Sequence, residues 1–118
     1  ISVAAGAFGA HFLHDKLTQH YLEVYETAVR YQLIHSLAII LTGMMGAHIR
    51  IPRFIFLLFV SGIILFSGSL YLLIAGSMSD PNPLRMAGAI TPLGGLSFIA
   101  AWFSLAYYAL KKEIDPLK

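Results

Sequence analysis

Apolar residues fill four stretches of this chain, and the charged residues lie between and after them. The stretches cover residues 1–13, 31–47, 54–75 and 92–110. An α-helix rises 1.5 Å per residue, so about 17 to 25 apolar residues cross the roughly 30 Å hydrocarbon layer of a bilayer. The last three stretches are long enough for this. The pattern therefore predicts membrane-spanning helices there.

The first stretch is shorter than a bilayer requires. As a helix, residues 1–13 cover roughly 20 Å, and the chain begins at Ile1 rather than at a methionine. A signal peptide is the alternative, but no basic segment precedes the apolar run, and glycines and histidines interrupt it. We expect a membrane helix whose first residues lie upstream of Ile1.

Residues 18–30 have a different, amphipathic pattern. Glu23, Glu26 and Arg30 fall on one face of a helix, and the other face is apolar and contains Tyr25. A helix with a charged face and tyrosines is typical of the membrane interface, where aromatic rings lie at headgroup depth. We predict an interfacial segment here, before the second span. Residues 18–48 contain no proline and no early glycine, so the segment and the span can form one helix.

Prolines mark the connections between the predicted helices. Pro52 suits the first turn of a helix, where its missing N–H costs nothing, and Thr91-Pro92 suits another helix start. Residues 80–83 read Asp-Pro-Asn-Pro, which is typical of a loop. Short connections join antiparallel neighbours. We therefore predict an all-α fold, an antiparallel bundle of four transmembrane helices with the interfacial segment between the first two. It forms a single integral membrane domain over residues 1–118.

Composition supports a membrane protein and excludes several other classes. Of the 118 residues, 58% are apolar and only 12% are charged, whereas a soluble domain averages about 25% charged. The absence of cysteine excludes a disulfide scaffold. The net charge of +2 comes from scattered basic residues, so we predict no nucleic-acid partner. All charged residues lie outside the four stretches, which counts against an ion-coupled carrier.

The distribution of basic residues predicts the orientation. In bacterial membrane proteins, the loops richer in lysine and arginine face the cytoplasm. The turn at 48–53 and the C-terminus share one side, which holds five basic residues against three on the other. The five are Arg50, Arg53, Lys111, Lys112 and Lys118, and the three are Lys16, Arg30 and Arg85. We predict that both termini lie in the cytoplasm.

Small residues on each predicted helix mark its packing face. Helices in lipid associate where small side chains let their backbones approach closely. The candidates for such contacts are Gly6, Ala10, Gly62, Gly68, Ser69, Gly94 and Ala101.

The uncharged polar residues of the spans form the only candidate site. Antiparallel connection brings them to the end of the bundle opposite the turn at 48–53, which is the non-cytoplasmic end in our orientation. They are His11, Tyr31, Gln32, His35, Ser67, Ser69, Tyr71 and Thr91.

Three hypotheses explain these polar residues. They hydrogen-bond to each other and fix the bundle, because polar groups in hydrocarbon need partners. Alternatively, they line a pocket for a small molecule or a lipid headgroup. In the third hypothesis His11 and His35 bind a metal ion or haem, although neither cysteine nor a nearby carboxylate supports such a site. The sequence has no Gly-x-Ser-x-Gly motif, phosphate loop or His-Glu-x-x-His motif, so we predict no catalytic residue.

Four stretches resemble one protein family. They are Gly6-Ala-Phe-Gly-Ala-His11, Tyr25-Glu-Thr-Ala-Val-Arg-Tyr-Gln32, Leu65-Phe-Ser-Gly-Ser-Leu-Tyr71 and Ile90-Thr-Pro-Leu-Gly-Gly95. The family is the membrane family called domain of unknown function four-two-three, which is similar to a small transmembrane protein of animals numbered two-five-six. The resemblance implies a four-helix protein of the bacterial plasma membrane and a first helix that starts earlier. It implies no activity.

We therefore expect a non-enzymatic accessory or binding component that holds a lipid or a small hydrophobic ligand at the polar end. Membrane lipids are its expected partners, and we expect no cofactor. A redox protein with histidine-bound metal or haem is one alternative. A small transporter is another, and it requires a homo-oligomer or a larger membrane complex because four short helices enclose little volume.

Overall fold

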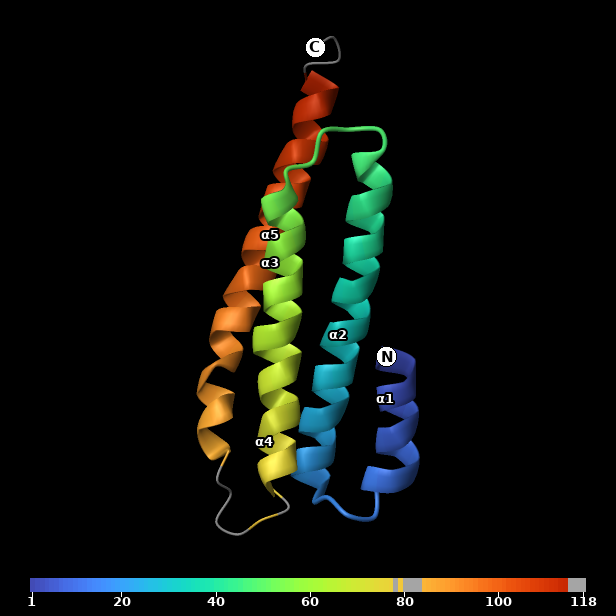
Figure 1. Ribbon diagram of the computed structural model, residues 1–118, viewed down its shortest axis with the longest axis vertical. Helices are drawn as coiled ribbons and strands as arrows, with labels where there is room; N and C mark the ends of the chain where they lie inside the picture. Colours follow the sequence, from blue (N-terminus) through green and yellow to red (C-terminus); the bar gives the residue numbers. More distant parts are fainter. Residues whose placement is uncertain (78, 80–83, 115–118) are drawn as a thin grey trace.

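The computed structural model describes residues 1–77, 79 and 84–114, and these are almost entirely helical (Figure 1). A short α1 continues into one π-helical turn, η1. A long α2 follows. The next helix is one continuous rod made of α3, a π-helical turn η2 and α4. A 3₁₀ turn, η3, leads into the last helix, α5. Their bounds are Ser2–Phe8 for α1, Gly9–Leu13 for η1, Gln19–Gly46 for α2, Arg53–Gly62 for α3, Ile63–Gly68 for η2, Ser69–Ser77 for α4, Arg85–Ala89 for η3 and Thr91–Ile114 for α5.

The helix boundaries follow the local sequence. No proline interrupts α2, and its first glycine is Gly43, so the helix runs for 28 residues without a break. Pro52 is the residue immediately before α3, and α5 begins at Thr91, one residue before Pro92. A proline near a helix start is favourable because the first N–H groups of a helix have no partner within it.

The predicted interfacial segment forms the first half of α2, in one continuous helix with the span that follows. Its amphipathic pattern is as expected, since Glu23, Glu26 and Arg30 are exposed while Tyr25 is buried. The buried face packs against α1 and α4, however, and nothing in residues 18–46 breaks the helix. One face of this segment therefore packs inside the bundle, and the charged face lies on the bundle surface.

Among the described residues, three helices are long and apolar enough to cross a membrane. They are Gln19–Gly46, Arg53–Ser77 and Met86–Lys111. They contain the predicted stretches 31–47, 54–75 and 92–110 almost completely. The helix at Ser2–Leu13 is apolar but shorter, so the fourth predicted span lacks the length of the others within the described residues.

The helices form a flat, elongated bundle of 60 × 26 × 17 Å. The α3–η2–α4 rod lies between α2 and α5, and α1 packs on the side of α2 that faces away from the rod (Figure 1). The turn between α2 and α3 lies at the same end as the end of α5. The turn between η1 and α2 and the start of α5 lie at the opposite end.

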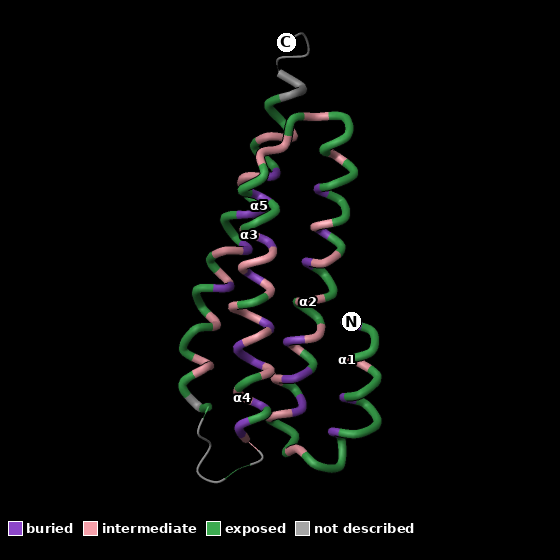
Figure 2. Tube along the Cα trace, in the orientation of Figure 1, coloured by how far each residue is buried: buried purple, intermediate pink, exposed green. Residues whose placement is uncertain are grey.

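Two small cores hold the helices together, and buried positions follow the facing sides of the rods (Figure 2). One core joins α2, α3 and α5 and includes Ala38, Ile55, Phe59, Phe98, Ala101 and Leu105. The other joins η1, α2 and α4 and includes Leu13, Tyr25 and Ile74. Many large apolar side chains remain on the outside, such as Leu57 and Phe103. A surface of this kind suits lipid better than water.

Glycine permits the two closest helix contacts. A methyl group on Gly94 would lie 2.7 Å from the Cα of Phe66, and one on Gly62 would overlap the Phe98 ring. These two glycines therefore bring α5 against the central rod. Among the other packing candidates, Ala101 and Ser69 are buried.

The candidates on the first helix and in η2 pack less closely. A methyl group on Gly6 would make an ordinary contact with Val29, at 3.6 Å. Ala10 is exposed, and its neighbour Gly9 faces the Tyr25 ring instead. At Gly68 a methyl group would meet nothing closer than a carbonyl of its own helix, at 4.0 Å.

Candidate ligand-binding groove

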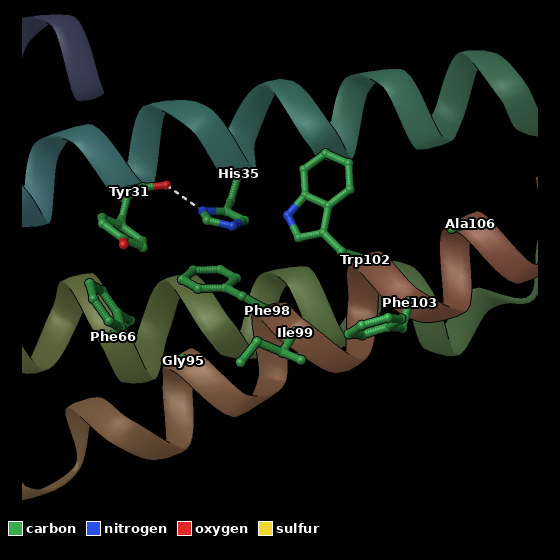
Figure 3. Close-up of a pocket in the computed structure, with 9 residues that line it drawn as sticks. All are labelled: Tyr31, His35, Phe66, Gly95, Phe98, Ile99, Trp102, Phe103 and Ala106. Atoms are coloured by element: carbon green, nitrogen blue, oxygen red, sulfur yellow. Dashed lines mark hydrogen bonds between the residues drawn. The ribbon is translucent and has the colours of Figure 1, made fainter.

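His35 lies near the middle of α2 and is almost fully buried, with 5% of its surface exposed. Its Nδ1 is 2.8 Å from the carbonyl oxygen of Tyr31, one helical turn earlier (Figure 3). A carbonyl oxygen can only accept, so the hydrogen of this bond is carried by Nδ1. The other ring nitrogen, Nε2, has no hydrogen-bond partner among the residues that the structure describes.

Aromatic rings from α3 and α5 surround the His35 ring. The Phe98 ring stacks on it, with 3.4 Å between the centroids and 10° between the planes. Phe59 and Trp102 lie 6.1 and 6.3 Å away by the same measure. Because Gly62 has no side chain, the Phe98 ring fits against the central rod at this level. The imidazole is thus held by one hydrogen bond and by ring packing.

A groove of about 610 Å³ opens beside this ring, between α2 and α5 (Figure 3). No charged residue lines it. Its walls come from α2, η2 and α5 and consist of Tyr31, His35, Phe66, Gly95, Phe98, Ile99, Trp102, Phe103 and Ala106. Phe103 and Ile99 are more than half exposed, so the groove opens on the outer, apolar surface of the bundle. Pockets for small molecules commonly have about 300–1,000 Å³, mostly apolar walls and a few polar groups.

The other predicted polar residues form separate contacts outside this groove. Tyr71 donates a hydrogen bond of 2.7 Å to the Gln32 side-chain oxygen, which joins α4 to α2. The hydroxyls of Ser69 and Thr91 are 2.8 Å apart and join α4 to α5. Ser67 in η2 is buried, and its hydroxyl is the only fully buried side-chain N or O atom without a partner in the described part of the chain.

Comparison with known families identifies the chain. The sequence model of the family described as "Protein of unknown function (DUF423)" matches residues 5–95. The chain belongs to this family. The match begins within α1, covers α2 and the central rod, including Tyr31, His35 and Phe66, and ends at Gly95 in the second turn of α5.

Relatives of this DUF423 protein carry membrane-protein names. The chain is 43% identical to a UPF0382 membrane protein of Staphylococcus haemolyticus over 113 residues, which cover 94% of this chain and 87% of the relative. It is 37% identical to the UPF0382 membrane protein YwdK of Bacillus subtilis over 115 residues, with 94% and 88% covered. No solved structure matches. The protein is therefore a membrane protein of a family of unknown function, and these relatives are bacterial.

The structure of the DUF423 protein does not bring the two candidate metal ligands together. His11 is exposed on η1, and α1 with η1 packs on the side of α2 away from the central rod. The ring contacts of His35 are all with Tyr31 of α2 or with α3 and α5. The described residues contain no group of three or more histidine, aspartate or glutamate side chains that could hold a metal ion.

Most residues of the groove lie outside the predicted polar set. Only Tyr31 and His35 are among both the predicted and the observed lining residues. The missed residues are mainly those that α5 supplies at Gly95, Phe98, Ile99, Trp102, Phe103 and Ala106. Their spacing of three and four residues places them on one helical face. This face is recognisable from the spacing, but its residues are apolar, so polarity does not distinguish them from residues that face lipid.

Proposed function

We propose that this protein is a non-enzymatic membrane component that holds a small hydrophobic molecule or a lipid chain in the groove between α2 and α5. One observation carries the proposal: His35 lines the groove, and its Nε2 has no hydrogen-bond partner among the described residues. A polar atom in apolar surroundings is unfavourable until it is hydrogen-bonded. A bound molecule with a polar head would supply that bond.

The walls support an apolar ligand. Aromatic side chains offer large contact areas, and ring pairs contribute about 0.5–1.5 kcal/mol beyond area burial. Five of the nine lining residues are phenylalanine, tyrosine or tryptophan. The groove is open toward the lipid-facing surface, so a ligand dissolved in the bilayer can enter without crossing water.

The test is native mass spectrometry of the protein purified in a mild detergent. We expect His35→Phe to lose at least nine-tenths of a bound small molecule that the unchanged protein retains, because phenylalanine keeps the ring packing but has no Nε2. His11→Phe is the matched control, since His11 is exposed and does not line the groove. Identical bound species in all three proteins would contradict the proposal.

We also propose the membrane arrangement: a bundle of four transmembrane helices in the bacterial plasma membrane, forming one integral domain with both termini in the cytoplasm. The turn between α2 and α3 lies at the same end as the end of α5, and this side carries five basic residues against three. An excess of lysine and arginine on one side favours a cytoplasmic location for that side.

Reporter fusions at the C-terminus test this orientation. We expect a green fluorescent protein fusion to fluoresce and an alkaline phosphatase fusion to be inactive, because the phosphatase folds only outside the cytoplasm. The converse pair of results would overturn the proposed orientation while leaving the groove unaffected.

A further inference from the structure

The hydrogen bond of His35 determines which kind of head group it can bind. Its Nδ1–H donates to the Tyr31 carbonyl oxygen at 2.8 Å, so the neutral ring presents Nε2 as a lone pair. Nε2 is unpaired but is not among the fully buried unpaired atoms of the described ranges, so it keeps some exposed surface, and His35 lines the groove. A lone pair accepts a hydrogen bond. The complementary ligand therefore carries an O–H or N–H donor.

The shape of the groove restricts the ligand further. The Tyr31 and Phe66 rings stack at 4.4 Å, and Phe98 stacks on His35. These flat faces suit a planar ring better than a bulky head. Trp102 also lines a second hollow of about 470 Å³, whose other walls are aliphatic residues of α2 such as Leu37 and Leu41. An apolar tail that leaves the groove past Trp102 would lie in this hollow.

We infer that the groove selects an aromatic hydroxyl with a long apolar tail, as in a quinol or another long-tailed phenol. The phenolic O–H donates to Nε2 of His35, the ring lies among the aromatic walls, and the tail follows α2 past Trp102. This inference rests on the proposed function, because it names the ligand class of the same groove. It involves no chemical conversion of the ligand.

A matched pair of probes tests the O–H donor. 4-Nonylphenol and its methyl ether share the ring and the tail, but only the phenol can donate. Binding is followed by the emission of Trp102, the only tryptophan of the chain, with excitation at 295 nm. We expect the phenol to bind about tenfold more tightly than the ether, the upper end of what one hydrogen bond contributes. His35→Phe should abolish this preference, and His11→Phe should retain it.

Each alternative result has a separate meaning. Equal binding of the phenol and the ether to the unchanged protein would overturn the donor requirement and leave the proposed function standing. Binding of 1-dodecanol as tight as that of the phenol would overturn the aromatic head. Absence of binding by all three probes would contradict the proposed function itself. The comparison of probes uses the unchanged protein, so it is decisive even where His35→Phe does not fold.

Discussion

Gly94→Ala is expected to lower the free energy of unfolding by about 3 kcal/mol, the upper end of the usual cost of overpacking. The added methyl group would lie 2.7 Å from the Cα of Phe66 and still closer to its backbone nitrogen. A backbone atom cannot rotate away, so α5 would have to move off the central rod. The measurement is thermal unfolding in detergent, followed by circular dichroism and by the fraction of protein that elutes as a single species after heating.

Gly43→Ala is the matched control for this prediction. A methyl group on Gly43 would meet nothing within 4 Å. Both glycines lie inside helices, where alanine is the better helix former by about 1 kcal/mol. Gly43→Ala should therefore leave the stability unchanged or raise it slightly. If the two variants have the same melting temperature, the close contact between α5 and η2 does not exist in solution.

The helical architecture could largely be predicted from the sequence, because length and polarity determine it. Residues 54–75 contain no charge and no proline, and they all lie within one continuous helix, Arg53–Ser77. The contact between Tyr71 and Gln32 joins two residues of the predicted polar set, as antiparallel connection requires. Residues 18–30 differ from the following span in their amphipathic pattern, but no proline or glycine interrupts the chain between them, and the structure has a single helix there.

The groove could not be predicted in the same way. In a water-soluble protein, polarity distinguishes the buried face of a helix from the exposed one. In a membrane helix both faces are apolar, since lipid tails are as apolar as a leucine side chain. Phe98 is buried and Phe103 is largely exposed, yet their residue type is the same. Which rings meet His35 depends on the rotation of α5 about its own axis.

The π-helical turns are a second reason why the facing side of each helix could not be predicted from the sequence. A π turn takes one residue more than an α turn and rotates everything that follows relative to a regular helix. The turn η2 lies in the middle of the central rod and contains Phe66 and Ser67. Phe66 lines the groove, and the Ser67 hydroxyl is buried without a partner in the described residues. A helical projection with a regular period therefore misplaces residues beyond η2, including Ser69 and Tyr71.

Phe59→Ala is expected to lower the free energy of unfolding by about 3 kcal/mol, the lower end of the usual cost of replacing a buried aromatic side chain by alanine. Phe59 is fully buried, and its ring lies edge-on to Trp102 at 5.3 Å. Lipid does not reach the space that the ring leaves, so the van der Waals contacts are lost without replacement. Phe56→Ala on the same helix is the control, because Phe56 is 45% exposed and lipid or detergent can replace its contacts. Thermal unfolding in detergent should separate the two variants clearly. Equal losses for both would show that the facing sides of α3 and α5 do not form a packed core.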